Sequence, residues 1–253
     1  MVVLAEGPDR RVRLDDLELQ LALTAYETPE LAGMFEMTAS ATVRYGGGCR
    51  DVSTVLAEDV VATLSGIASQ HLKSRLDAPS PSIAVWHLCE QSLTVSRASV
   101  PAESTIVRRA GGWQVRLSPH AKRLMRAFRA RKLPSETGGV MLGRMDVGAK
   151  TVYVVGALGS PCDSVEWPDL YVRGVKGLAR AVEEVKRRTG GHVEYVGEWH
   201  SHPDRCSSRP SEDDKEAHRW LVERMAATGH PGLLAIQGQH HRPHFMLSSG
   251  SSH

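Results

Sequence analysis

The spacing of hydrophobic residues along the chain predicts which segments are helices and which are strands. In the first hundred residues, apolar side chains three or four positions apart predict helices over 14–26 and 58–76. Short apolar runs bounded by turn residues predict two strands of a hairpin at 83–88 and 92–96. We therefore expect a small α+β domain over residues 1–105.

Strands and helices alternate in the second half of the chain, residues 106–253, where Gly111 and Gly112 are expected to mark the boundary. Ser118, followed by Pro119, is a typical helix start. Strands are expected at 113–117, 140–142, 152–155, 193–200, 233–236 and 245–247; helices are expected after Ser118, over 175–185 and after Ser211; residues 161–167 are expected to form a polar loop. This order predicts an α/β sandwich.

Composition indicates an ordinary globular protein. The chain has 253 residues, of which 41% are hydrophobic and 24% charged. No apolar run reaches the roughly 20 residues that a membrane helix needs, and the N-terminus lacks the apolar core of a signal peptide. We expect a cytoplasmic protein that has no membrane partner.

Charge is distributed unevenly along the chain. Residues 1–105 carry 8 Lys or Arg against 14 Asp or Glu, a net charge of −6, whereas residues 106–253 carry 23 against 15, a net charge of +8. The basic half could attract an acidic partner, although the cations of one expected helix fit a solvated helix face well: Arg123, Arg126, Arg129 and Arg131. Aromatic residues are not interleaved with these cations, so nucleic-acid binding is not expected.

The four cysteines are scattered and include no Cys-x-x-Cys pair, which argues against a disulfide framework or a structural zinc site. Cys206, between the two halves of the histidine motif described next, is read as a free loop thiol.

One stretch has the spacing of a metal site. His200 and His202 are separated by one residue at the end of an expected strand, so their imidazoles share a face. Pro203 follows, and Ser211-x-x-Asp214 comes after a short loop. Two imidazoles and a carboxylate leave one open position, as in catalytic zinc sites. Taken alone, Ser-x-x-Asp is also an ordinary helix capping box.

Two further features of the sequence could take part in chemistry. Glu136 stands just ahead of a glycine-flanked apolar strand, where a lone carboxylate is most simply an exposed loop residue. His240, His241 and His244 form a second histidine cluster. Adjacent residues on a strand face opposite sides of the sheet. We therefore interpret this cluster as surface or partner-contacting residues in preference to a metal site.

Together these motifs resemble the JAMM/MPN metalloprotease domain, most closely its prokaryotic JAB branch. The resemblance covers about residues 113–247, and Met141 replaces the usual leucine of the glutamate strand. The matching positions are Pro134-x-Glu136-x-x-Gly139-x-Met141-x-Gly143 and His200-x-His202-Pro203-x7-Ser211-x-x-Asp214. The resemblance implies a mixed sheet flanked by helices, with one zinc ion per chain held by His200, His202 and Asp214.

The resemblance also implies roles and a substrate. Glu136 would be the general acid and base, and Ser211 would donate a hydrogen bond to the oxyanion. The substrate would be a bond after the glycine-rich C-terminus of a ubiquitin-like protein, either in a precursor or in a conjugate. Cognate activating or conjugating enzymes would be further partners. Alternatives are a catalytically weak scaffold that binds a partner, or a peptidase acting on a sulfur-carrier protein.

Residues within 1–105 resemble the C-terminal part of ThiF/MoeB-type activating enzymes, around Gly48-Cys49-Arg50-Asp51 and the helix and strand that follow. A cysteine before such a helix can be catalytic in that family. The glycine-rich nucleotide half is missing, so Cys49 is interpreted as vestigial or structural.

Overall fold

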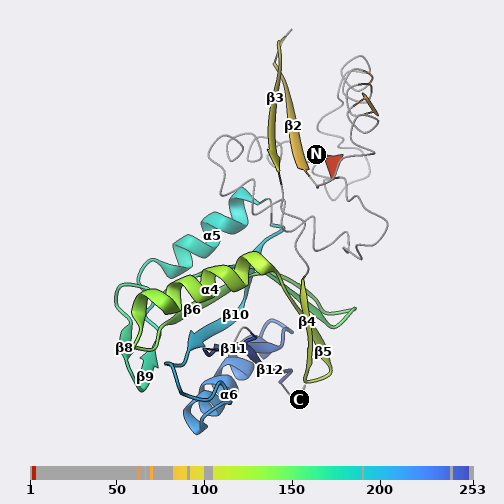
Figure 1. Cartoon of the computed structure of the whole chain (residues 1–253). Coiled ribbons are helices and arrows are strands. Elements are labelled where there is room, and N and C mark those ends of the chain that lie inside the picture. The colour runs from red at the N-terminus through yellow and green to blue at the C-terminus, as the bar shows by residue number, and fades with distance from the viewer. Residues whose placement is uncertain are drawn as a thin grey trace. The chain divides into compact units, whose positions relative to one another are not determined.

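A computed structural model describes residues 105–189, 191–239 and 242–250, with parts of the first 104 residues: 2–3, 62, 66, 69–70, 82–89 and 92–99. The chain separates into two compact units, one of Met1–Ala102 with Arg187–Gly190 and one of Glu103–Lys186 with Gly191–His253. Figure 1 shows the elements of each unit. No helix among the described residues is long and apolar enough to cross a membrane.

In the first unit, β2 (Ser82–Cys89) and β3 (Ser92–Ser99) pair antiparallel, which confirms the expected hairpin. The short strand β1 (Val2–Val3) pairs with β2. The expected helix over 14–26 and Cys49 lie outside the described residues. Of the helix expected over 58–76, the described positions 62, 66, 69 and 70 are helical.

The second unit is built on one seven-stranded sheet in the order β12-β11-β10-β6-β7-β5-β4. Its strands are β4 (Ile106–Ala110), β5 (Trp113–Leu117), β6 (Gly138–Asp146), β7 (Thr151–Leu158), β10 (Glu194–Ser201), β11 (Gly232–Gln237) and β12 (His244–Ser248). The pairs β10·β11 and β5·β7 are parallel and the others are antiparallel. This mixed sheet, flanked by helices, confirms the expected fold class.

Three helices accompany this sheet: α4 (Pro119–Lys132), α5 (Leu178–Arg188) and α6 (Glu212–Ala226). Ser118 begins α4 as predicted, because its side chain accepts a hydrogen bond from the Ala121 amide. The helix α4 packs on β6 and β7, and α6 packs on β11 and β12. Because Trp199 contacts α4 while its neighbour His200 contacts α6, the two helices cover opposite faces of the sheet.

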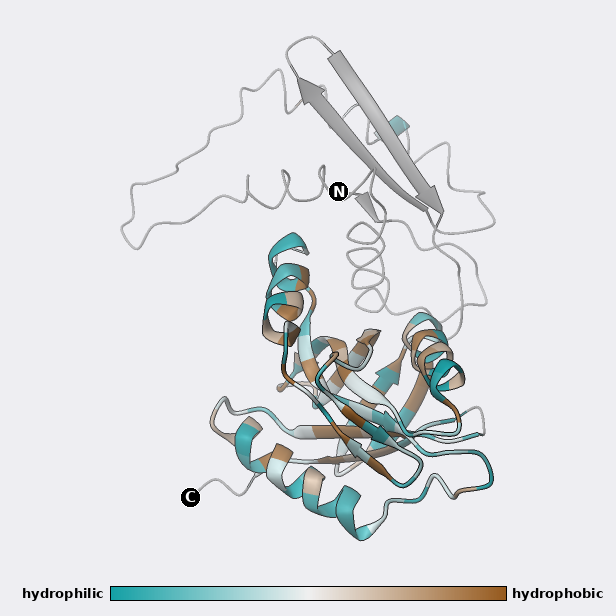
Figure 2. Cartoon of the chain, turned by 90° about the vertical axis from the view of Figure 1, so that its left-hand side faces the viewer, coloured by the Kyte–Doolittle hydropathy of each residue, from teal (hydrophilic) through white to brown (hydrophobic). Residues whose placement is uncertain are grey.

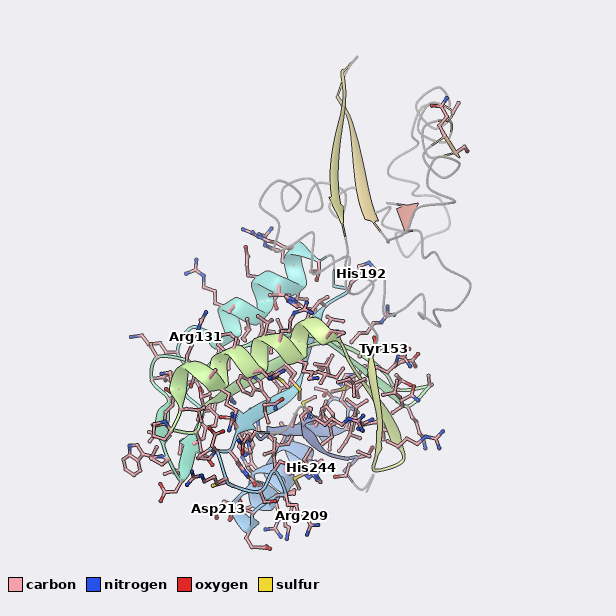
Figure 3. All side chains as sticks on the ribbon, in the orientation of Figure 1. Arg131, Tyr153, His192, Arg209, Asp213 and His244 are labelled. Carbon is pink, nitrogen blue, oxygen red and sulfur yellow. The ribbon has the colours of Figure 1, made fainter. Side chains whose placement is uncertain are left out.

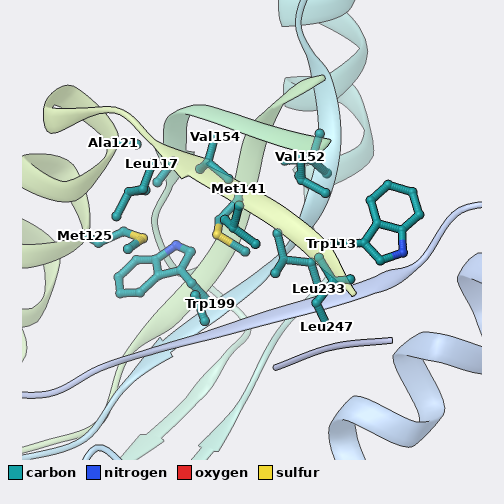
Figure 4. Packing of buried hydrophobic residues seen from close by; sticks show 14 residues of the cluster. Trp113, Leu117, Ala121, Met125, Met141, Val152, Val154, Trp199, Leu233 and Leu247 are labelled. Atoms are coloured by element: carbon teal, nitrogen blue, oxygen red, sulfur yellow. The ribbon is translucent and has the colours of Figure 1, made fainter. Parts of the chain in front are cut away.

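The hydrophobic core lies between α4 and the sheet. Figure 4 shows Met125 beside the indole of Trp199, with Met141 in the centre of the cluster. Both methionines are fully buried, and Trp199 is 1% exposed. Phe128 stacks on Trp199 with ring centroids 6.0 Å apart. Figure 2 shows the matching pattern on the helices, whose ribbons alternate between hydrophilic and hydrophobic residues.

Three expectations about local structure were wrong. Gly111 and Gly112 form the turn between β4 and β5 inside the sheet; their φ angles of 55° and 78° suit glycine. Part of the expected loop 161–167 is strand β8 (Val165–Trp167), which pairs with β9 (Leu170–Val172). The pairing forms because a short turn separates two segments that each carry one valine and one aromatic residue, both common in strands. Val175 precedes α5 and is 70% exposed, so it does not belong to the buried stripe of that helix.

Candidate metal centre

The end of β10 presents the two histidines. His200 is paired with Gly138 of β6 on one side and with Ile236 of β11 on the other. A Cβ atom on Gly138 would lie 2.4 Å from the Trp199 carbonyl oxygen and 2.4 Å from the Tyr171 ring, so glycine is required for this close approach. Ser201 ties the two strands together further, because its amide donates to the Thr137 carbonyl and its Oγ accepts from the Thr137 amide.

Three donor groups converge as the sequence predicts. The Nε2 atoms of His200 and His202 are 3.3 Å apart, and Asp214 places Oδ1 2.8 Å from His200 and Oδ2 3.4 Å from His202. All three residues are less than 9% exposed. Among the residues that the structure describes, they form a cluster whose ligand atoms lie within 4.8 Å of one another.

The distances in this cluster fit zinc. A tetrahedral ion with bonds of about 2.05 Å separates neighbouring ligand atoms by about 3.3 Å. The 3.3 Å between the two imidazole nitrogens matches this value, and each Asp214 oxygen faces a different histidine, at 2.8 Å from His200 and 3.4 Å from His202. Imidazole nitrogen and carboxylate oxygen are ordinary zinc ligands, so the residues present fit the metal in geometry and in chemistry.

A backbone carbonyl sets the tautomer of His202. Its Nδ1 lies 2.6 Å from the Ser207 carbonyl oxygen, which can only accept a hydrogen bond. Nδ1 therefore carries the proton, and Nε2 of the neutral ring faces the other donors with its lone pair. In the metal-free site the Asp214 hydrogen bond raises the pKa of His202, so protons compete with a metal for Nε2.

Asp214 combines a structural contact with its place in the cluster. It lies at the third position of α6, where a capping box joins it to Ser211. The Asp214 amide donates to Ser211 Oγ at 3.1 Å, and the Ser211 amide donates to Asp214 Oδ2 at 2.6 Å. Burial opposes ionisation, but the hydrogen bonds from His200 and His202 outweigh it and hold the pKa of Asp214 below its ordinary value.

Glu136 lines the same pocket as the three donors. Its amide donates to the Trp167 carbonyl at 2.8 Å, so β8 fixes the backbone just ahead of β6. Burial raises the pKa of Glu136 above its ordinary value of 4.5, although the two histidines partly offset this effect. A carboxylate with a raised pKa beside a candidate metal site suits proton transfer near neutral pH.

The pocket measures 570 Å³ and lies between the β8–β9 hairpin, β10 and α6. Tyr171 of β9 stacks on His200 with ring centroids 6.4 Å apart. Arg173, which directly follows β9, donates a hydrogen bond to the Glu198 carboxylate at 2.9 Å. Asp213, labelled in Figure 3, lies in the first turn of α6 at the edge of this pocket. Glu136, Ser211 and the three donors thus meet in one concave site.

Sequence reasoning did not anticipate several residues around the site. Tyr171 stacks on a candidate ligand, and Glu166 accepts from Thr137 Oγ1 at 2.5 Å. Both belong to the β8–β9 hairpin, whose strand Val165–Trp167 lies in the segment that the sequence predicts to be a loop. The signal was the short alternation of polar and apolar residues on either side of Pro168, which fits a hairpin.

The remaining sequence candidates lie at the margins of the site or away from it. Cys206 is an exposed free thiol that lines the pocket, as its reading as a loop thiol implies. His244 is exposed at the start of β12 (Figure 3). His240 and His241 lie outside the described residues.

Comparison with known families agrees with this geometry. A model of the family described as prokaryotic homologs of the JAB domain matches residues 118–247. The chain belongs to this family. The match covers α4 to β12 and includes Glu136, His200, His202, Ser211 and Asp214.

Similar proteins include a curated relative and a solved structure. A protein of Enterobacter hormaechei subsp. hoffmannii (strain UCI 50), named CD-NTase/cGAS isopeptidase, is 40% identical over 80 residues, which is 32% of this chain and 42% of that protein. The match therefore spans less than half of the relative's length. The solution structure of protein DSY2949 from Desulfitobacterium hafniense is 22% identical over 50% of this chain and 77% of that chain, with a TM-score of 0.36.

Proposed function

We propose that this JAB-family protein is a zinc-dependent isopeptidase or peptidase that cleaves after the C-terminus of a ubiquitin-like protein. The convergence of His200, His202 and Asp214 beside Glu136 is the observation that carries the proposal. Family membership and the isopeptidase name of the Enterobacter relative support hydrolysis of a peptide or isopeptide bond. The retention of all three donors favours an enzyme over a catalytically weak scaffold.

His200, His202 and Asp214 would hold the metal, with the Ser207 carbonyl fixing the orientation of His202. Bound zinc would supply a Lewis acid that polarises the scissile carbonyl and lowers the pKa of water to about 7. Glu136 accepts the proton of the attacking water and then delivers it to the leaving amine. Its raised pKa serves the first step, because a more basic carboxylate accepts the proton of water more readily.

Ser211 would stabilise the oxyanion. Its Oγ already accepts from the Asp214 amide, which leaves the hydroxyl proton for donation to the substrate. The same hydroxyl can therefore begin α6 and donate a hydrogen bond in the transition state. Such a donor contributes about 10²- to 10³-fold to the rate.

The substrate would approach as an extended tail with glycines near the scissile bond, because residues without side chains pass most easily over a site walled by Tyr171 and α6. Both precursor trimming and release from a conjugated target fit this geometry. The name of the Enterobacter relative joins an isopeptidase to a CD-NTase or cGAS, so a conjugate of such an enzyme belongs among the test substrates.

The test is incubation of the full chain with a panel of ubiquitin-like fusions, including glycine-tailed proteins, a sulfur-carrier protein and a conjugate of a CD-NTase. Product masses are measured with and without a zinc chelator. We expect cleavage directly after a C-terminal glycine, loss of cleavage with the chelator and recovery on adding zinc. Chelator-resistant cleavage, or no cleavage of any fusion by zinc-loaded protein, would contradict the proposal.

A further inference from the structure

Arg129 is a buried cation that the chemistry of the pocket does not use. It lies in the last turn of α4, and its side chain is 10% exposed. Burying a guanidinium is strongly unfavourable unless its donors are paired. Here Nε donates to the His202 carbonyl at 2.9 Å, and Nη2 donates to Asp204 Oδ1 at 2.5 Å. Both acceptors belong to the loop that directly follows β10.

These two bonds use one edge of the guanidinium. Nε and Nη2 present parallel N–H groups in a fixed plane, so they hold two acceptors at a defined separation. One acceptor is the backbone of a candidate metal ligand, and the other is a carboxylate two residues later. A lysine carries the same charge but cannot reproduce this planar pair.

The loop after β10 needs these two hydrogen bonds, here called the Arg129 clamp, because its own backbone conformation is unfavourable. Arg205 has a φ of 66°, in the left-handed region that is unfavourable for a non-glycine residue. The loop must nevertheless bring the Ser207 carbonyl to within 2.6 Å of His202 Nδ1. The His202 amide is bonded to the Gln237 carbonyl at 3.1 Å, so Arg129 holds the opposite side of the same residue.

Arg129 lies on a helix, α4, that packs tightly against the hydrophobic core. Phe128, next to Arg129, stacks on Trp199, and Met125, one turn earlier, is fully buried. The position of Arg129 is therefore set by the core on the face of the sheet opposite the pocket. A side chain on this support can fix the backbone of His202 without touching the substrate.

We propose that Arg129 is a positioning residue for the metal: its guanidinium edge holds the His202 carbonyl and the Asp204 carboxylate, which aims His202 Nε2 at the metal. This inference rests on the metal site of the proposed function. Removing an outer partner of a metal ligand typically weakens metal binding by about 10- to 100-fold. A merely structural Arg129 would change the stability of the metal-free protein and leave the metal affinity of the folded protein unchanged.

The test compares Arg129→Lys with Arg126→Lys, a matched change at an exposed position of the same helix. Zinc affinity of the full chain is measured by competition with a chromophoric chelator, and the visible spectrum of the Co²⁺-loaded protein reports the ligand geometry. We expect Arg129→Lys to bind zinc about 10- to 100-fold more weakly and to shift the Co²⁺ bands. The control should match the wild type in both readouts.

Asp204→Asn tests the same clamp should Arg129→Lys not fold, because Asp204 is 51% exposed in its side chain and can be changed safely. Weakening a charge-assisted bond at this position should lower zinc affinity toward the lower end of the same range, about 10-fold. Wild-type affinity and spectra in both variants would overturn the inference, even if the metal-free proteins melt earlier. Failure of the wild type itself to bind zinc would instead overturn the proposed function, and the inference with it.

Discussion

Trp199 and His200 are neighbours in β10, yet their side chains lie on opposite faces of the sheet. The Trp199 face packs against α4 in a dry core of Met125, Met141 and Phe128. The His200 face looks onto the pocket, where Asp214 and Glu136 are gathered beside α6. One strand therefore contributes to the stability of the fold on one side and to the candidate chemistry on the other.

The difference between the two faces of β10 explains why polar groups can be buried at this site. The apolar face stabilises β10 by removing large side chains from water, at about 25 cal/mol per Å². The polar face concentrates two imidazoles and two carboxylates, whose desolvation is unfavourable unless they are paired or bound to a metal. We expect substitutions on the α4 face to lower stability and substitutions on the α6 face to lower activity.

The largest effect is expected for Glu136→Gln. Loss of the proton-transferring carboxylate should reduce kcat/KM by about 10²- to 10⁴-fold, because general acid and base catalysis contributes this much. Zinc content and the thermal midpoint should stay near wild-type values. The matched control, Glu183→Gln on the exposed surface of α5, should keep full activity. Unchanged cleavage by Glu136→Gln would remove Glu136 from the mechanism.

Trp199→Ala tests the other face of the strand. Truncating this fully packed side chain should lower the free energy of unfolding by about 3–5 kcal/mol, since it leaves a cavity beside Phe128. Chemical denaturation of the metal-free protein measures the change. The same truncation at Trp220, which is 49% exposed, should cost much less. Equal losses at both positions would mean that the α4 face does not hold the core.

Ser211→Gly separates the two roles of one hydroxyl. Glycine is nearly as good as serine at a helix N-cap, so stability should fall by only a few tenths of a kcal/mol. Activity should fall by about 10²- to 10³-fold, because the oxyanion donor is lost. Ser211→Thr, which keeps a hydroxyl, should restore most of the rate. Parallel losses of stability and activity would leave capping as the only role of Ser211.

The smallest effect concerns His218, buried on α6. Burial lowers the pKa of His218, although its hydrogen bond to the Gly232 carbonyl partly offsets the shift. The unfolded chain therefore takes up this proton first, and the stability tied to the neutral ring is lost as pH falls below about 6.5 through the lower folded-state pKa. Thermal midpoints measured from pH 7.5 to 5.5 should fall less in His218→Gln than in the wild type. The exposed control His244→Gln should follow the wild-type slope.

Much of this arrangement could be predicted because it depends on local patterns. The Ser118-Pro119 start of α4 and the Ser211–Asp214 capping box depend on neighbouring residues, and both are confirmed. The spacing of His200 and His202 at a strand end likewise placed both imidazoles on one face. Periodicity alone was enough for these elements.

The parts that could not be predicted depend on contacts between distant segments. Arg129 and His202 are 73 positions apart, and nothing in either segment indicates their hydrogen bond. The sequence pattern instead grouped Arg129 with the exposed cations of α4, whereas its side chain is buried. Tyr171 was missed for the same reason, because its stacking on His200 depends on how the β8–β9 hairpin folds over β10.

The central claim is that the α6 face of β10 holds one zinc ion. Elemental analysis after dialysis against trace zinc tests it most directly, with His202→Ala as the altered site and the exposed His244→Ala as the control. We predict about one zinc per chain in the wild type and in His244→Ala, and almost none in His202→Ala. A wild-type protein without zinc, or full zinc content in His202→Ala, would contradict the account.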